Sequence, residues 1–153
     1  MSQGVIEAIF VTPRGGTNME RVSEVEALAD LGLEGDRYCA GAGYWSGIDE
    51  CQVTLIEAED LDEIVKTTGI RVVNGEHRRN LVTRGIRLNE LRGRRFQVGQ
   101  ARLEYDRPRP PCTYVESLTQ PGMTRALGRR GGICARVVAS GLICVNDTIA
   151  LVL

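Results

Sequence analysis

The chain has 153 residues, of which 42% are hydrophobic and 25% are charged, with a formal net charge of −1 at pH 7. These values are typical of one globular domain, which we place over residues 1–153. No apolar run approaches the roughly 20 residues of a transmembrane helix, and the first residues lack the pattern of a secretory signal. We therefore expect no membrane association and a cytoplasmic location.

The first half of the chain predicts short strands around one helix. Residues 4–12 and 21–28 are rich in β-branched or alternating apolar residues and predict two strands. Residues 30–50 are rich in glycine and predict a long ordered loop, and residues 52–56 predict a buried strand. A helix is predicted over residues 57–67, because apolar positions recur at helical spacing behind an acidic first turn, and Gly69 ends it.

The second half of the chain predicts further strands. Residues 80–83 predict a short strand, residues 88–91 at most one helical turn, and residues 94–98 with 101–105 a hairpin around Gly99 and Gln100. Residues 112–118 are compatible with the start of a short helix. Residues 132–139 and 142–153 predict strands that close the chain. Many short strands and few helices indicate a mainly β protein, either a β-barrel or an α+β domain.

Charge is distributed unevenly along the chain. Residues 1–70 carry four basic and fourteen acidic side chains, whereas residues 71–153 carry fifteen basic and six acidic ones. Eighteen of the nineteen basic residues are arginine, whose planar guanidinium suits phosphate and carboxylate groups. The clustering indicates an anion-binding site built by the second half.

The cysteine and histidine content excludes several common sites. The five cysteines show no C-x-x-C spacing, and His77 is the only histidine, so we expect no zinc site. We expect reduced thiols rather than a disulfide framework, with Cys51, Cys134 and Cys144 in the core. Lys66 is the only lysine and lies among acidic residues on the predicted helix, so pyridoxal phosphate is not expected.

Cys112 differs from the other cysteines in its surroundings. Arg107 and Arg109 precede it in a run that contains three prolines. Nearby cations favour a thiolate, which is the form that acts as nucleophile or metal ligand, and the prolines restrict the backbone that presents it. Cys112 is therefore the candidate catalytic or metal-binding residue.

Three short segments could supply an anion site. The first is Gly35, Asp36 and Arg37, which taken alone is most often only a turn. The second is the run of residues 77–80, for which a solvated loop is the simpler interpretation. The third is the run of residues 129–132, whose backbone could form a nest for an anion. From the basic or amide side chains in and near the last two segments, we take Arg78, Arg79, Asn80, Arg129 and Arg136 as candidate ligands of the anion.

These segments, in this order, resemble the MOSC domain found at the C-terminus of molybdenum cofactor sulfurases and as stand-alone bacterial proteins. The matching stretches are GLEGDRY at 32–38, residues 78–104, PPC at 110–112 and residues 131–149. The resemblance implies a β-barrel-like domain related in shape to the barrel domain of pyruvate kinase. It implies that Cys112 binds the molybdenum of the cofactor, molybdopterin, or carries sulfur as a persulfide. It also matches Gly35, Asp36 and Arg37, and Arg79 and Asn80, to elements of the family.

The resemblance leaves two activities open. One is a molybdenum-dependent reductase of N-hydroxylated compounds, which needs an electron-transfer partner because the chain has no cysteine spacing for an iron–sulfur cluster. The other is transfer of sulfur to the cofactor, with a cysteine desulfurase as partner. In both, Arg37, Arg79 and Arg109, with Arg78, Arg129 and Arg136, would hold the phosphate and lower the thiol pKa.

A different class of function is a non-catalytic module that binds phosphorylated ligands or nucleic acid through the positive second half. Nucleic acid is the less favoured ligand, because aromatic residues are only 5% of the chain and do not alternate with the arginines.

Overall fold

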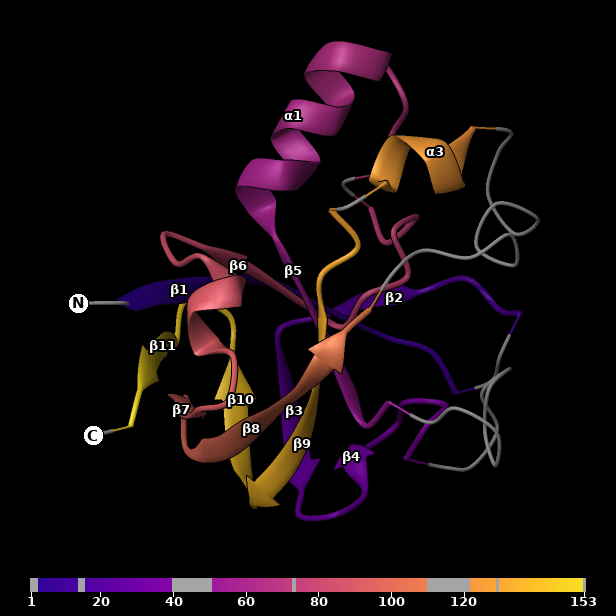
Figure 1. Cartoon of the computed structure of the whole chain (residues 1–153). Coiled ribbons are helices and arrows are strands. Elements are labelled where there is room, and N and C mark those ends of the chain that lie inside the picture. Colours follow the sequence, from indigo (N-terminus) through magenta and orange to yellow (C-terminus); the bar gives the residue numbers. More distant parts are fainter. Residues whose placement is uncertain are drawn as a thin grey trace.

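A computed structural model describes residues 3–13, 16–39, 51–72, 74–109, 122–128 and 130–152. Its main feature is a closed barrel of short strands, with helices α1 and α3 together at one end (Figure 1). The expected mainly β, barrel-like fold is therefore confirmed.

Seven strands close the barrel. Around the ring they are β1 (Gln3–Val11), β11 (Thr148–Leu151), β7 (Arg95–Val98), β8 (Ala101–Pro108), β9 (Ile133–Ala139), β5 (Val53–Glu57) and β6 (Leu81–Arg84). Strand β1 closes the ring because it pairs antiparallel with β11 on one side and with β6 on the other. The β5–β6 pair is parallel, with helix α1 lying in the connection between the two strands.

A smaller sheet of order β10–β3–β4 extends the barrel. It consists of β10 (Gly141–Cys144), β3 (Glu24–Leu28) and β4 (Gly32–Leu33). The prediction of a single strand over residues 21–28 is wrong, because the strand is interrupted at Ser23. Strand β2 (Glu20–Val22) pairs with β1, whereas β3 pairs with β10. The loop expected over residues 30–50 is interrupted by β4, and residues 40–50 lie outside the described part.

Two hydrophobic cores hold these elements in place. The larger one fills the barrel and includes Ile9, Leu55 and Phe96, each fully buried. The smaller one lies between the barrel wall and the two helices, and includes Phe10 and Ile64. Residues 9 and 10 therefore point to different cores, as the alternation of side chains along a strand requires.

The helices cover one end of the barrel. Helix α1 (Ala58–Thr68) buries Ala58, Leu61 and Ile64 as its spacing predicts, while Val65 is exposed at the edge of the apolar stripe. Gly69 ends the helix with a left-handed backbone, φ 72°. A single 3-10 turn spans Leu88–Leu91, as expected, whereas α3 (Met123–Leu127) was not predicted. No helix in the described part is both long and apolar enough to span a membrane.

A disulfide joins Cys51, just before β5, to Cys134 on β9. The expectation that these cysteines are reduced is therefore wrong, although both are buried as predicted. The two residues are 83 positions apart, so their spacing gave no sign of the pairing. The pairing of β5 with β9, in which Thr54 lies opposite Cys134, brings the chain just before β5 close to β9. Cys144 is a half-buried free thiol at the end of β10 and not a core residue.

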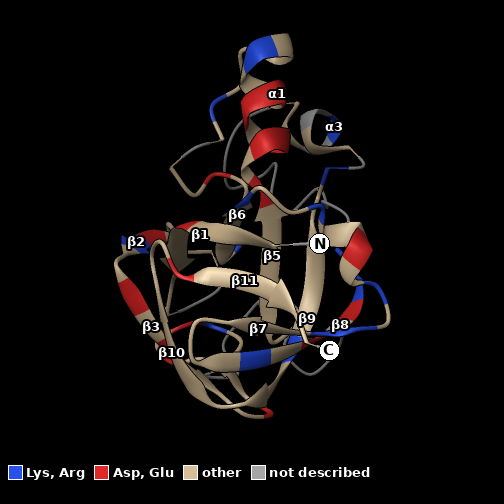
Figure 2. Cartoon of the chain, turned by 90° about the vertical axis from the view of Figure 1, so that its left-hand side faces the viewer, with Lys and Arg blue, Asp and Glu red and all other residues tan. Residues whose placement is uncertain are grey.

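The acidic first half and the basic second half of the chain are interleaved in space. Helix α1 is largely acidic, with Lys66 in its last turn (Figure 2). Arg84 on β6 forms ion pairs with Glu7 on β1 and Asp62 on α1. Part of the positive excess of residues 71–153 is therefore balanced across strand and helix contacts.

Candidate functional site

The Gly35–Asp36–Arg37 turn is partly buried, since Gly35 is exposed but Asp36 and Arg37 are not. Asp36 Oδ1 accepts from the backbone N–H of Thr12 at 3.2 Å and from Arg37 Nη1 at 3.1 Å. The Arg37 guanidinium also lies over the ring of Tyr38, 4.9 Å from its centroid. These contacts attach the turn to the end of β1.

Residues 77–80 form a buried connection, so their interpretation as a solvated loop is wrong. Arg78 has a left-handed backbone, φ 61°, which is uncommon for a residue with a side chain. Its carbonyl accepts from Arg37 Nη2 at 3.3 Å, and its own Nη1 donates to the carbonyl of Thr17 at 2.7 Å. The two segments predicted to contribute to one site are thus in direct contact.

His77 is completely buried beside these arginines. Its Nδ1 accepts from the backbone N–H of Arg79 at 2.8 Å, and its ring packs edge-on against Phe10 with centroids 5.3 Å apart. Burial, together with the charges of Arg79 and Arg21, lowers the pKa of His77 to about 3. The imidazole is therefore neutral at physiological pH and fixes the local backbone.

Asn80 ties three barrel strands together. Its Oδ1 accepts from the N–H and the hydroxyl of Thr54, each at 3.0 Å, and its Nδ2 donates to the carbonyl of Phe10 at 3.0 Å. Since Thr54 is on β5 and Phe10 on β1, the amide acts as a structural link at the start of β6. Thr54 was not predicted as a contributor, because nothing in its sequence context marks it.

Arg79 links the chain segments on either side of residues 110–130. Its Nε donates to the carbonyl of Gly131 at 2.6 Å, and its Nη2 donates to the carbonyl of Arg109 at 3.1 Å. The N–H of Arg109 in turn donates to the carbonyl of Gly132 at 2.9 Å. The end of β8 and the start of β9 are therefore fixed to each other and to the 77–80 connection. Cys112 follows Arg109 by three residues in the sequence.

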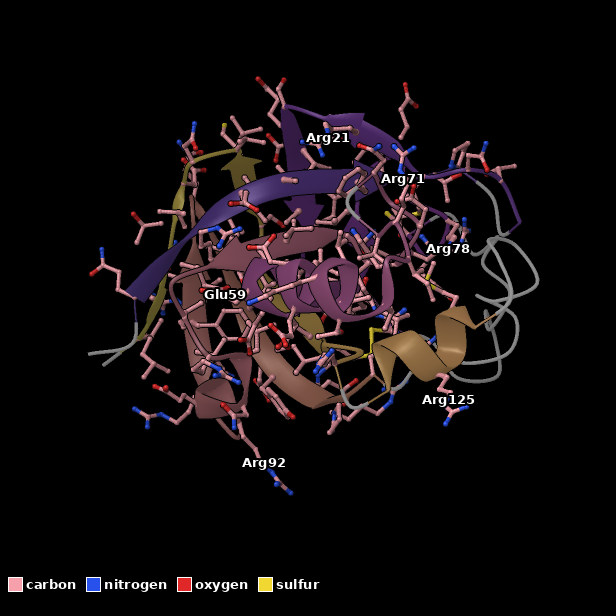
Figure 3. The ribbon with its side chains drawn as sticks, turned by 90° about the horizontal axis from the view of Figure 1, so that it is seen from above. Arg21, Glu59, Arg71, Arg78, Arg92 and Arg125 are labelled. Carbon is pink, nitrogen blue, oxygen red and sulfur yellow. A yellow bond between two sulfur atoms is a disulfide. The ribbon has the colours of Figure 1, made fainter. Side chains whose placement is uncertain are left out.

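The structure does not gather every predicted residue. Cys112 and Arg129 lie outside the described residues. Arg136 lies apart on β9, half exposed, where it pairs with Glu104 at 3.1 Å. Viewed from above, Arg78 is on the side of the molecule that also carries α3 and Arg125, while Arg92 projects from another edge (Figure 3).

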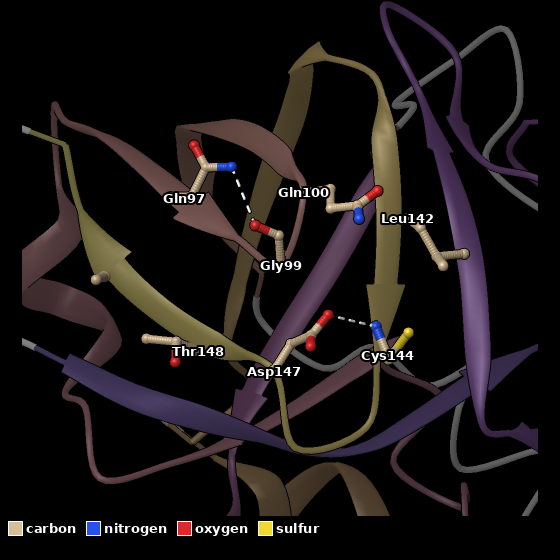
Figure 4. A pocket seen from close by; sticks show the side chains of 8 residues that line it. Gln97, Gly99, Gln100, Leu142, Cys144, Asp147 and Thr148 are labelled. Atoms are coloured by element: carbon tan, nitrogen blue, oxygen red, sulfur yellow. Dashed lines mark hydrogen bonds between the residues drawn. The ribbon is translucent and has the colours of Figure 1, made fainter.

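The described residues also bear on metal binding and on a cavity at the turns of the barrel. No group of three or more histidine, cysteine and carboxylate side chains is placed there to hold a metal. A pocket of about 360 Å³ lies where the β7–β8 and β10–β11 turns meet, and Cys144 and Asp147 line it (Figure 4). None of the predicted site residues lines that pocket.

Comparison with solved structures supports the barrel fold. The structure of YuaD from Bacillus subtilis aligns with a TM-score of 0.80 at 18% identity, covering 97% of this chain and 95% of that one. YiiM from Escherichia coli aligns with a TM-score of 0.69 at 20% identity, covering 97% of this chain and 70% of that one. YiiM from Geobacillus stearothermophilus aligns with a TM-score of 0.67 at 18% identity, covering 99% and 73%. At such identities the likeness concerns the fold.

The sequence itself was compared with curated proteins and with family models. No curated protein sequence matches the chain. The model of the MOSC domain matches residues 42–150, which is more than half of the chain and spans β5 to β11. The chain therefore belongs to the MOSC domain family.

Proposed function

We propose that this chain binds the molybdenum cofactor, or carries sulfur for it, through the thiolate of Cys112. The observation that supports this proposal best is the double hydrogen bond from Arg79 to the carbonyls of Arg109 and Gly131. It fixes both flanks of the segment that contains Cys112 to the buried 77–80 connection. A reactive cysteine needs such a fixed base if its sulfur is to meet a ligand in one orientation.

The donor set near this base fits an anionic ligand with a soft metal. Arg109 and Arg130 are partly exposed and lie on the two segments that Arg79 joins. Guanidinium groups suit a phosphate, and a cysteine thiolate is a ligand that molybdenum accepts. The cofactor, when bound, supplies two-electron redox chemistry.

The buried arginines take a different role from the one expected. Arg37, Arg78 and Arg79 are 4–6% exposed and donate to carbonyl oxygens or to Asp36. We assign them the task of holding the framework, and assign phosphate binding to Arg109 and Arg130. Arg136, paired with Glu104 on the outer surface, receives no part in the site.

Two activities follow from the same thiolate. As a metal ligand, Cys112 would anchor the cofactor of a reductase of N-hydroxylated compounds, whose electrons come from a separate flavin or iron–sulfur protein. As a sulfur carrier, it would attack the terminal sulfur of a desulfurase persulfide. That sulfur then bonds to Cys112, and the desulfurase cysteine leaves as a thiolate.

Native mass spectrometry of the whole chain tests the proposal. Wild type and Cys112→Ala are each mixed with freshly released molybdenum cofactor, and separately with a cysteine desulfurase and free cysteine. We expect wild type to gain the mass of the cofactor, of one sulfur atom, or of both, and Cys112→Ala to gain neither.

Cys144→Ala is the matched control, since Cys144 is a partly buried free thiol that lines the pocket at the β7–β8 turn. It should behave as wild type. Equal mass gains in wild type and Cys112→Ala would contradict the proposal, as would the absence of both gains in wild type.

A further inference from the structure

Three cysteines other than Cys112 lie on the β5–β9 side of the barrel. Cys39 and Cys51 precede and follow residues 40–50, and both line one pocket of about 290 Å³. Cys39 is a free thiol, whereas Cys51 is bonded to Cys134. A thiol and a disulfide therefore share a cavity. Its other lining residues are Asp30, Leu31, Tyr38, Gln52, Asp106 and Arg136.

Local packing brings the two chain segments together. A Cβ added to Gly32, whose φ is 123°, would lie 2.7 Å from the carbonyl oxygen of Gln52, so glycine is needed for this approach. The N–H of Asp36 then donates to the carbonyl of Leu33 at 3.0 Å, which turns the chain back. The backbone before Cys39 is thus held beside the backbone that follows Cys51.

Access distinguishes the three sulfur-bearing residues. Cys134 is fully buried and does not line the pocket, whereas Cys51 does line it although it is 1% exposed. Cys39 is half-buried. Among the described cysteines, Cys51 and Cys39 are therefore the two that line the pocket, so the disulfide is approached from the side of Cys51.

We propose that Cys39, Cys51 and Cys134 form a thiol–disulfide exchange site. The Cys39 thiolate attacks the sulfur of Cys51, a Cys39–Cys51 bond forms, and the Cys51–Cys134 bond breaks. Cys134 leaves as a thiolate and takes up the proton that Cys39 released. One disulfide and one thiol are present before and after, so no oxidant or reductant is consumed.

Exchange would move a restraint from one part of the barrel to another. The present bond ties the start of β5 to β9, whereas a Cys39–Cys51 bond would instead close residues 39–51 into a ring. Cys134 is the register partner of Arg107 on β8, two residues before Arg109. A freed Cys134 would therefore lie beside the strand that leads to the candidate site. This inference does not depend on cofactor binding.

Burial of Cys39 and the charges around it control the rate of exchange. Burial first, then Asp36 and Glu34, raise the pKa of its thiol, so that only a small part is thiolate at neutral pH. Below that pKa the thiolate fraction, and hence the exchange rate, rises about tenfold per pH unit. The other charged groups that face the pocket are Asp30, Asp106 and Arg136.

Disulfide mapping tests the site in the intact, unreduced protein. Samples are held at pH 6, 7 and 8, quenched in acid with a maleimide, digested with pepsin and analysed by mass spectrometry. We expect a Cys39–Cys51 peptide beside the Cys51–Cys134 peptide, forming about 100-fold faster at pH 8 than at pH 6. Maleimide should mark Cys134 in the same fraction of molecules.

Two variants give the comparison. Cys39→Ser should retain the Cys51–Cys134 peptide and lose all exchange, while Cys144→Ser, which removes the other described free thiol, should exchange as wild type does. Absence of a Cys39–Cys51 peptide at every pH would overturn the proposal. So would a peptide that forms only in urea, since it would then arise from the unfolded chain, or a native protein without the Cys51–Cys134 bond.

Discussion

The Nε of Arg79 donates a hydrogen bond to the carbonyl oxygen of Gly131 at a distance of 2.6 Å. The second bond of the same guanidinium, to the carbonyl of Arg109, gives a planar fork that spans two chain segments. Arginine is suited to this task because its donors are fixed relative to each other, whereas lysine offers one compact charge.

Arg79→Lys should therefore weaken the fold and the site together. An ammonium group can satisfy one of the two carbonyls but not both, and a buried carbonyl left without a donor costs about 1–3 kcal/mol. We expect the free energy of unfolding to fall by about 2 kcal/mol. Urea titration measures the stability, and retention of added cofactor measures the site.

Arg92→Lys is the control for this substitution, since Arg92 is exposed on the 3-10 turn side of the barrel. The free energy of unfolding of this variant should stay within about 0.5 kcal/mol of the wild-type value, as is usual for substitutions at the surface. Equal stabilities of the Arg79 and Arg92 variants would show that the fork contributes nothing.

His77 should give the protein a distinct acid sensitivity. Its pKa is about 3 in the folded state, against about 6.5 in an unfolded chain. Below pH 6.5 the unfolded chain therefore binds a proton that the folded protein does not, so stability is fully present above pH 6.5 and lost as the pH falls. The loss approaches about 1.4 kcal/mol per pH unit.

His77→Asn should remove this term and keep the structure, because an amide oxygen can accept from the Arg79 N–H in place of Nδ1. Urea unfolding at pH 7.0, 5.5 and 4.5 gives the slope for both proteins, and carboxylates common to both cancel in the difference. Parallel pH profiles would contradict the assignment of a neutral, buried imidazole.

Local signals predicted most of the fold. Short runs rich in apolar and β-branched residues located β1, β5 and β6, the turn at Gly99 and Gln100 located the β7–β8 hairpin, and the helical stripe with Gly69 located α1. The order of strands around the barrel was not predictable in this way, since it depends on pairings between distant segments such as β1 with β11. The break at Ser23 was missed because both halves of residues 20–28 have the same strand-like composition.

The sequence indicated which segments come together better than it indicated the roles of their residues. Clustered arginines next to polar segments indicated that residues 35–37 and 78–80 contribute to one site, and the hydrogen bond from Arg37 to the Arg78 carbonyl shows that the two segments are in contact. The burial of these arginines was not predicted, because composition does not show that a guanidinium will donate its hydrogen bonds to backbone carbonyls. The Cys51–Cys134 disulfide was missed because the two cysteines are 83 residues apart, and only the pairing of β5 with β9 brings their segments together.

Gly132 should tolerate no side chain. Its φ is 86°, and a Cβ there would collide with the carbonyl oxygen of Leu55 on the neighbouring strand. Gly35 has nearly the same φ, 85°, with nothing within 4 Å of an added Cβ. Gly35→Ala should therefore cost only the backbone strain of about 1 kcal/mol, and Gly132→Ala at least about 3 kcal/mol.

Thermal and urea unfolding measure the loss of stability in each glycine variant. The difference between the two losses gives the cost of the steric clash at Gly132, because the backbone strain is common to both variants. Similar costs at the two positions would mean that β5 and β9 separate easily at Gly132.

Glu57 should make the fold slightly less stable at neutral pH than its amide counterpart. Burial, with help from Asp60 and Glu59, raises the pKa of this carboxyl, against the lowering effects of the Leu88 N–H and Arg87. Because the folded state then binds the proton more tightly than the unfolded chain, this contribution to stability is lost as pH rises from about 4.3 through the folded pKa. Glu57→Gln should remove that decline, and its amide oxygen can still accept from Leu88 N–H.

Glu104→Gln provides a control of opposite sign for the same urea titrations between pH 3.5 and 7. Hydrogen bonding to Arg95, followed by the charge of Arg136, lowers the pKa of Glu104. The stabilising effect of Glu104 is therefore present above about pH 4.3 and lost as the pH falls. The Glu104→Gln variant should accordingly be less stable than wild type at pH 7. If both amide variants shifted the pH profile in the same direction, burial could not be what distinguishes Glu57 from a surface carboxylate.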